Sequence, residues 1–160
     1  MPLSSVFRKI YPECPYRAGA IITVGINRER MMGLNTQRGT SPKVVFTAMS
    51  KHTFFFREQI SAFVFGEGAI PVNPFMLFGY FLSDLVERDA VRRANNHLIT
   101  KADELWVFGP ISDGVMPEII LAKGMALPIR YFRIKDSSVI LEIAEEDATY
   151  EPGAQPIPRD

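Results

Sequence analysis

The chain has 160 residues, 47% of them hydrophobic, which suffices for one domain with a real core and leaves little room for a second. The chain has 18 lysine and arginine residues and 18 aspartate and glutamate residues, so its formal net charge is zero. The net charge therefore does not indicate a nucleic acid polymer as partner. The single cysteine, Cys14, excludes an internal disulfide, and no apolar run approaches the roughly 20 residues of a membrane span. We therefore expect a cytoplasmic protein that does not associate with membranes.

The two ends of the chain differ in composition from its middle. Residues 1–42 contain scattered prolines and glycines with one strand-like run at 20–26, and we interpret them as an irregular N-terminal extension, either a hairpin or a solvated arm. Several prolines at 146–160 predict a loose C-terminal tail. The folded domain is expected at 43–145.

Between these ends, short apolar runs alternate with amphipathic segments. Strands are predicted at 43–49, 69–73, 104–108, 128–132 and, at a sheet edge, 139–143. Helices are predicted at 53–66, 84–101 and 115–125, with an aromatic-rich connection at 75–81. In the second helix, Leu85, Leu98 and Ile99 are expected to face the core. The alternation predicts a single α/β domain with a Rossmann-like, doubly wound parallel sheet of about four to five strands.

Polar residues follow three of these strands at the edge where open α/β sheets bind ligands. The loops at this edge contain Ser50, Lys51 and His52 after the first strand, Asn73 and Pro74 after the second, and Ser112, Asp113 and Gly114 after the third. Glu118 follows Gly114 by one helical turn, where free backbone N–H groups and the helix dipole favour a charged carboxylate. It is either an ordinary acidic residue of a first helical turn or a nucleophile or acid/base group presented to a substrate.

Several classes of site have no support in the sequence. His52 and His97 lack the spacing and the cysteine partners of a zinc site, so no metal is expected. Phosphate-loop, dinucleotide-binding and nucleophile-elbow motifs do not occur, and no cofactor is expected. The aromatic residues at 54–56 and 75–81 indicate core packing or a subunit interface, or a ring that stacks on a nucleobase.

Taken together, five segments between residues 43 and 132 resemble a known family. These segments are Ile70-Pro-Val-Asn-Pro74, Ala102-Asp-Glu-Leu-Trp-Val-Phe-Gly109, Ser112-Asp-Gly114, Glu118-Ile and Ala122-Lys-Gly-Met-Ala-Leu-Pro128. They are similar to the nucleoside 2-deoxyribosyltransferase-like superfamily, and more narrowly to a bacterial and phage branch of it. The resemblance implies a flavodoxin-like sheet, a homo-oligomer, and cleavage of the N-glycosidic bond of deoxynucleosides or their 5′-monophosphates. It also implies a glutamate nucleophile, which corresponds to Glu118.

The chain departs from the family pattern at three positions. The two acids that the superfamily often supplies correspond to Asn95 and Ser112, so Asn95 is a candidate for hydrogen bonds to the base and Ser112 for binding a 5′-phosphate. Phe75 stands where the narrower branch usually has histidine. Arg88 matches that branch and either binds phosphate or pairs with Asp84 on a helix surface.

The sequence therefore predicts an N-glycosidase or deoxyribosyltransferase-like enzyme that acts on a small-molecule nucleoside or nucleotide, with Glu118 as nucleophile. The candidate substrate-binding residues are Ser50, His52, Asn73, Arg88, Asn95, Ser112, Asp113 and Gly114. Two alternatives remain open: a non-catalytic nucleotide-binding or sensor module with the same fold, and a structural homo-oligomer.

Overall fold

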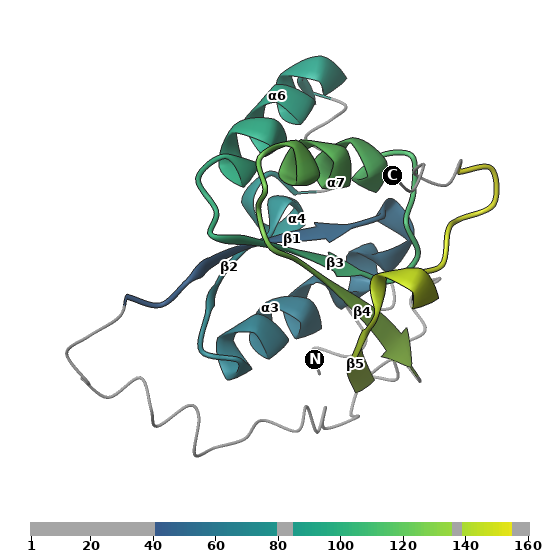
Figure 1. Ribbon diagram of the computed structural model, residues 1–160. Helices are drawn as coiled ribbons and strands as arrows, with labels where there is room; N and C mark the ends of the chain where they lie inside the picture. Colours follow the sequence, from purple (N-terminus) through teal and green to yellow (C-terminus); the bar gives the residue numbers. More distant parts are fainter. Residues whose placement is uncertain (1–40, 80–84, 136–138, 155–160) are drawn as a thin grey trace, which may run out of the picture.

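The computed structural model describes residues 41–79, 85–135 and 139–154 (Figure 1). The predicted extension up to residue 40, including Cys14, lies outside the described residues. So do the predicted helix start at 84, the Arg88–Asp84 pair and the last six residues of the predicted tail.

Five strands form one sheet in the order β2-β1-β3-β4-β5. Their bounds are β1 (Val44–Met49), β2 (Ile70–Val72), β3 (Glu104–Phe108), β4 (Ile129–Lys135) and β5 (Val139–Ile143). The first four pair in parallel, and β5 pairs antiparallel with β4 at the edge. This is the strand order of flavodoxin-like sheets, so the predicted doubly wound α/β fold is confirmed.

Helices cover both faces of the sheet, with α6 and α7 on one side and α3 on the other (Figure 1). Their bounds are η1 (Lys51–Phe56), α3 (Arg57–Gly66), α4 (Pro74–Leu77), α6 (Arg88–Ile99), α7 (Val115–Gly124) and η2 (Glu145–Asp147), where η marks a 3₁₀ helix. Among the described helices, none is long and apolar enough to cross a bilayer.

Two helical segments differ from the sequence-based expectation. The predicted helix at 53–66 is divided into the 3₁₀ helix η1 and the α-helix α3, and the predicted connection at 75–81 contains the short helix α4. The expectation that Leu85 faces the core is wrong, because α6 begins at Arg88 and Leu85 is 84% exposed. Helical spacing does not apply to a residue that lies outside the helix.

The core lies on both faces of β1 and β3, whose side chains are almost all buried. In β3, Leu105 and Val107 pack toward α7, while Trp106 and Phe108 pack on the other face with Ile60 of α3. Strands buried on both faces need continuous apolar runs, which is why these two strands are plain in the sequence. Each fully buried side chain of this size contributes about 1.5–3 kcal/mol.

The carboxyl ends of β1 and β3 lie side by side, because Met49 pairs with Phe108. The loops that follow them therefore meet at one edge of the sheet. Gly109 begins the second loop with φ +76°, and a Cβ atom there would lie 2.9 Å from Thr53 Cγ2 of η1. Glycine permits both this backbone conformation and this close approach.

Residues 146–154, the described part of the predicted tail, are not loose. Ile111 and Tyr150 form a parallel bridge, with Ile111 N donating to Thr149 O at 2.8 Å and Glu151 N donating to Ile111 O at 2.9 Å. This backbone pairing fixes the segment beside the loop after β3. It brings Glu151 to the edge of the sheet where the strand-end loops meet.

Candidate functional site

A crevice opens at the carboxyl ends of β1 and β3. It consists of two cavities of about 330 Å³ and about 850 Å³. The residues on the walls of both are Met49, Lys51, Phe75, Arg88, Asn95 and Glu118. Its walls come from the end of β1, from η1, α4 and α6, from the start of α7, and from the segment around Glu151. This is the edge at which open α/β sheets bind ligands, and the volume suits a small molecule.

All predicted site residues except Asn73 line this crevice. They are Ser50, His52, Arg88, Asn95, Ser112, Asp113, Gly114 and Glu118. Parallel strands brought the residues after β1 and β3 together, as predicted, and α6 added Arg88 and Asn95. Their roles toward a ligand stay predictions.

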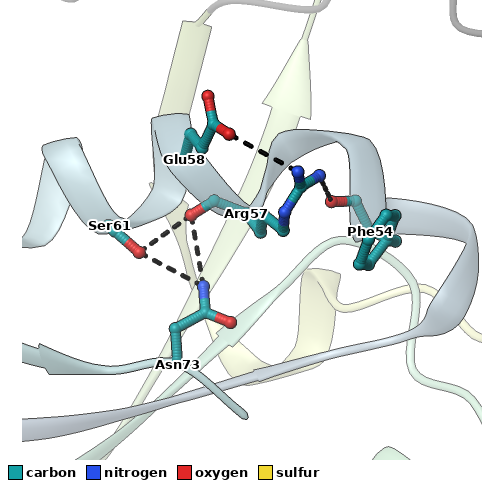
Figure 2. A network of polar contacts seen from close by, with 5 residues as sticks. All are labelled: Phe54, Arg57, Glu58, Ser61 and Asn73. Atoms are coloured by element: carbon teal, nitrogen blue, oxygen red, sulfur yellow. Dashed lines mark hydrogen bonds and ion pairs between the residues drawn. The ribbon is translucent and has the colours of Figure 1, made fainter. Parts of the chain in front are cut away.

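Asn73 is buried and its amide is engaged within the fold (Figure 2). Its Nδ2 donates to Arg57 O at 3.2 Å and to Ser61 Oγ at 3.3 Å, and its Oδ1 accepts from Phe75 N at 3.1 Å. Both amide hydrogens are thereby used, and the oxygen caps α4. The structure gives Asn73 a structural role, which joins the end of β2 to α3, in place of the predicted contact with substrate.

Arg57 fixes the junction between η1 and α3 (Figure 2). Its Nη1 donates to Phe54 O at 3.2 Å, its guanidinium lies 4.2 Å from the centroid of the Phe54 ring, and Nη2 lies 3.4 Å from Glu58 Oε1. These contacts hold the turn of η1, which carries Lys51 and His52 into the crevice.

Glu118 is half-buried in the first turn of α7. Its hydrogen-bond partner among the described residues is Asn95, whose Nδ2 donates to Oε1 at 3.4 Å. Burial raises the pKa of Glu118 to about 8, and the hydrogen bond from Asn95 opposes that rise. From the sequence, the helix N-terminus was expected to favour the charged form of Glu118. In the structure, burial disfavours that form and outweighs the effect of the helix N-terminus. Most Glu118 side chains therefore carry a proton at pH 7 in the free protein.

Asn95 has hydrogen-bonding capacity that the fold does not use. Its Oδ1 is buried and accepts no hydrogen bond from the residues that the structure describes, although its Nδ2 donates to Glu118. An unpaired buried acceptor typically costs about 1–3 kcal/mol.

Two cations in the crevice are available to an anionic ligand. Lys51 and Arg88 are exposed, line both cavities and form no ion pair with any residue that the structure describes. Arg92, by contrast, lies 3.0 Å from Asp89. The sequence analysis placed Lys51 at this edge by its position after the first strand but did not include it among the predicted substrate-binding residues.

The smaller cavity has an apolar wall formed by Met49, Pro74, Phe75, Phe78 and Val91. The Phe75 ring lies edge-on to Phe54, with a centroid distance of 5.4 Å. Phe75 therefore offers the crevice an aromatic surface at the position where the resembling branch usually has histidine. Aromatic rings of this kind stack on nucleobases.

Ser50 and Ser112 each begin a helical turn at the crevice. Ser50 Oγ accepts from His52 N at 3.1 Å, and Ser112 Oγ accepts from Val115 N at 3.4 Å. Each hydroxyl oxygen is thus used as a cap.

A histidine and a glutamate from distant segments meet in the larger cavity. His52 Nε2 lies 4.0 Å from Glu151 Oε2, and their side chains are 68% and 19% exposed. Sequence reasoning missed Glu151 because it falls in the predicted loose tail. No group of three or more histidine, cysteine, aspartate or glutamate side chains with the geometry of a metal site occurs among the described residues.

The family model "Domain of unknown function (DUF7768)" matches residues 45–132, which is more than half of the chain. No curated protein matches the sequence. The matched range begins in β1, ends within β4 and contains Glu118, Asn95 and Arg88, while Glu151 lies beyond it. The chain therefore belongs to the DUF7768 family.

Proposed function

We propose that the protein cleaves the N-glycosidic bond of a deoxynucleoside or its 5′-monophosphate, with Glu118 as the nucleophile. The observation that carries the proposal is the half-buried Glu118 carboxyl group, held by Asn95 in a crevice that has an aromatic wall and two cations without an ion-pair partner among the described residues. The resemblance to the nucleoside 2-deoxyribosyltransferase-like superfamily supports it, because Glu118 takes the place of that family's nucleophile.

The crevice offers a complementary surface to each part of a nucleotide. Phe75 and Phe78 suit the flat face of a base, and Lys51 and Arg88 suit a phosphate. Glu118 and Asn95 lie on the wall that both cavities share, where the sugar would join the two ends. The two cations favour the monophosphate over the uncharged nucleoside.

In the proposed reaction the Glu118 carboxylate attacks C1′ of the sugar. The C1′–N bond breaks, its electron pair leaves with the base, and the base takes up a proton. Water then attacks C1′ of the glycosyl ester and releases Glu118, or a second base does so in a transfer reaction. With a pKa of about 8, about one tenth of Glu118 is ionised at pH 7, so the rate of this first step rises with pH.

A non-catalytic nucleotide-binding module is the second candidate. Asn95 and Ser112 occupy positions where the resembling enzymes supply acids, and Glu118 is mostly neutral at pH 7. A crevice with these residues still binds a nucleotide through its cations and aromatic wall. The predicted homo-oligomer is also a proposal; the exposed apolar residues Met76 and Leu77 of α4 are a suitable contact surface for it.

Incubation with deoxynucleosides and their 5′-monophosphates separates these functions. We expect the wild-type protein to release free base, detected by chromatography, and Glu118→Ala to release none. Glu146→Ala, which changes an exposed glutamate of η2, is the matched control and should equal wild type. Saturable nucleotide binding by calorimetry without release of base would favour the binding module. Neither release nor binding would refute both functions.

A further inference from the structure

We infer that Arg57 and Asn73, which do not line the crevice, are positioning residues that hold the Phe75 ring in place as the platform for the nucleobase. This inference rests on the proposed function, which places a base against Phe75. It gives a role in ligand binding to two residues outside the site. The geometry behind it is a closed network of contacts that begins and ends at Phe75.

The backbone of Phe75 is fixed by Asn73. Asn73 Oδ1 accepts a hydrogen bond from Phe75 N at 3.1 Å. The carbonyl oxygen of Asn73 accepts from the N–H groups of Met76 and Leu77, each at 3.0 Å. Because α4 has four residues, too few for a helix that is stable by itself, its place depends on this cap. Asn73 therefore determines where the side chain of Phe75 starts.

The ring of Phe75 is fixed by the ring of Phe54. The two centroids are 5.4 Å apart and the ring planes meet at 83°, which is the edge-to-face arrangement that aromatic pairs favour. The Arg57 guanidinium lies 4.2 Å from the centroid of the buried Phe54 ring, and Arg57 Nη1 donates to Phe54 O at 3.2 Å (Figure 2). Arg57 thus holds the ring that holds Phe75.

Asn73 and Arg57 are also joined to each other. Asn73 Nδ2 donates to Arg57 O at 3.2 Å and to Ser61 Oγ at 3.3 Å (Figure 2). Ser61 Oγ in turn donates to Arg57 O at 2.8 Å. The network therefore runs from the Phe75 backbone to Asn73 and Arg57, and returns through Phe54 to the Phe75 ring. Since it is closed, each contact restricts the movement that the others permit.

The network meets the crevice at Phe75, which lines both cavities beside Asn95 and Glu118. An aromatic side chain that is already fixed loses less conformational entropy when a base stacks on it, so prior ordering strengthens binding. Loss of the network is therefore expected to weaken contacts with the base. Contacts with the phosphate, which the proposed function assigns to Lys51 and Arg88, should not change.

Two ligands that differ in the presence of a base test the inference. They are the common 2′-deoxynucleoside 5′-monophosphates and 2-deoxyribose 5-phosphate, which keeps the sugar and the phosphate. Calorimetry gives Kd in a Glu118→Ala background, where substrate is not consumed. We expect Phe75→Leu to weaken nucleotide binding about tenfold and Arg57→Met about fivefold, with less than a twofold change for 2-deoxyribose 5-phosphate. Arg57→Lys, which keeps a cation beside the Phe54 ring, should recover most of the affinity.

A double variant shows whether Arg57 acts through Phe75. Without the aromatic platform its ordering has no effect, so Arg57→Met should change the Kd of Phe75→Leu less than twofold, whereas independent effects would multiply to about 50-fold. The matched controls are Glu58→Gln, which changes an exposed partner 3.4 Å from Arg57 Nη2, and Arg93→Met on the surface of α6. Both controls should bind the two ligands as the background protein does.

Asn73 is tested by a pair of variants. Asn73→Ala removes the cap and the bond to Arg57 O, and should weaken nucleotide binding about fivefold. Asn73→Ser keeps a cap for Phe75 N and should recover part of that loss. Circular dichroism confirms that each variant is folded at the temperature of measurement, and the Arg57 variants decide the inference if Asn73→Ala does not fold.

The outcomes separate this inference from the proposed function. Equal losses on both ligands, multiplied effects in the double variant, or unchanged nucleotide affinity in Arg57→Met would overturn the positioning role, while base release by the wild-type protein upheld the proposed function. The expected affinities without base release would refute cleavage and support the positioning role at a nucleotide-binding site. A protein that releases no base and binds nucleotides no more tightly than 2-deoxyribose 5-phosphate would overturn both.

Discussion

Replacement of Asn95 by leucine is expected to move the ionisation of Glu118 to higher pH and so to slow glycosidic cleavage at neutral pH. Asn95 Nδ2 is the donor that the structure shows for the Glu118 carboxylate, at 3.4 Å. A hydrogen bond to the charged form lowers a pKa, so its loss raises the pKa of Glu118 further above the present value of about 8. Fewer Glu118 side chains are then carboxylates at pH 7.

The size of the effect follows from the length of the bond. A hydrogen bond to a charged group contributes about 1.5–3 kcal/mol, and a bond at 3.4 Å belongs at or below the lower end, so we take about 1 kcal/mol. One pKa unit corresponds to about 1.4 kcal/mol, so the pKa rises by somewhat less than one unit. The ionised fraction at pH 7 then falls about fivefold, whereas at pH 10 both proteins are almost fully ionised.

The assay is nitrophenolate release from 4-nitrophenyl 2-deoxyriboside 5′-phosphate between pH 6 and 10. Nitrophenolate leaves without taking up a proton, so the pH profile reports the ionisation of Glu118 rather than that of an acid. We expect Asn95→Leu to lose about fivefold in kcat/KM at pH 7 and less than twofold at pH 10. Arg93→Gln changes an exposed residue of the same helix and should follow the wild-type profile. A loss of the same size at every pH would refute the reasoning, since Asn95 would then act on something other than the charge of Glu118.

Three further predictions test the site and its frame. Glu118→Gln should be more stable than wild type, and the difference should grow from pH 4.5 to about 8, to on the order of a few kcal/mol, because the folded wild type retains a proton that the unfolded chain releases. Urea unfolding at pH 4.5, 7 and 9 measures this difference in the free energy of unfolding. A difference that does not change with pH would contradict the prediction. Lys51→Met and Arg88→Met should each weaken calorimetric binding of a deoxynucleoside monophosphate about tenfold and leave the nucleoside unchanged, whereas equal losses on both ligands would exclude a phosphate contact. Asn73→Ala should cost about 1–3 kcal/mol in urea unfolding, and a cost near zero would show that its buried amide bonds do not stabilise the fold.

The sheet was predictable because its central strands are buried on both faces. Val44–Met49 and Glu104–Phe108 form apolar runs that differ from the amphipathic helices on either side of them. The helix α4 was not predicted, since the four residues Pro74–Leu77 are too few to show a helical period. Its start depends on the side chain of Asn73, a cap that the sequence offers but does not distinguish from a ligand contact.

The site was predictable where it depends on strand ends and not where it depends on backbone pairing. Ser50 and Ser112 reach the crevice because parallel strands place their carboxyl ends together. Glu151 arrives through a bridge between Ile111 and Tyr150, and pairing of two backbones leaves no periodic pattern of side chains. The charge of Glu118 was also beyond prediction, because burial depends on how α6 packs beside α7.

The energetics of Glu118 argue for a ligand rather than for a structural role. An acidic residue that only completes the first turn of a helix lies in water or beside a cation, as Glu145 of η2 lies 2.6 Å from Lys123. Glu118 instead lies in an environment that opposes its charge, next to an amide whose oxygen is unpaired, and both features destabilise the free protein. Both costs fall on the same crevice wall, where a sugar that develops positive charge at C1′ would stabilise the carboxylate and a sugar hydroxyl would pair with the amide oxygen. A fold that bears these costs at one position is expected to recover them when substrate binds there.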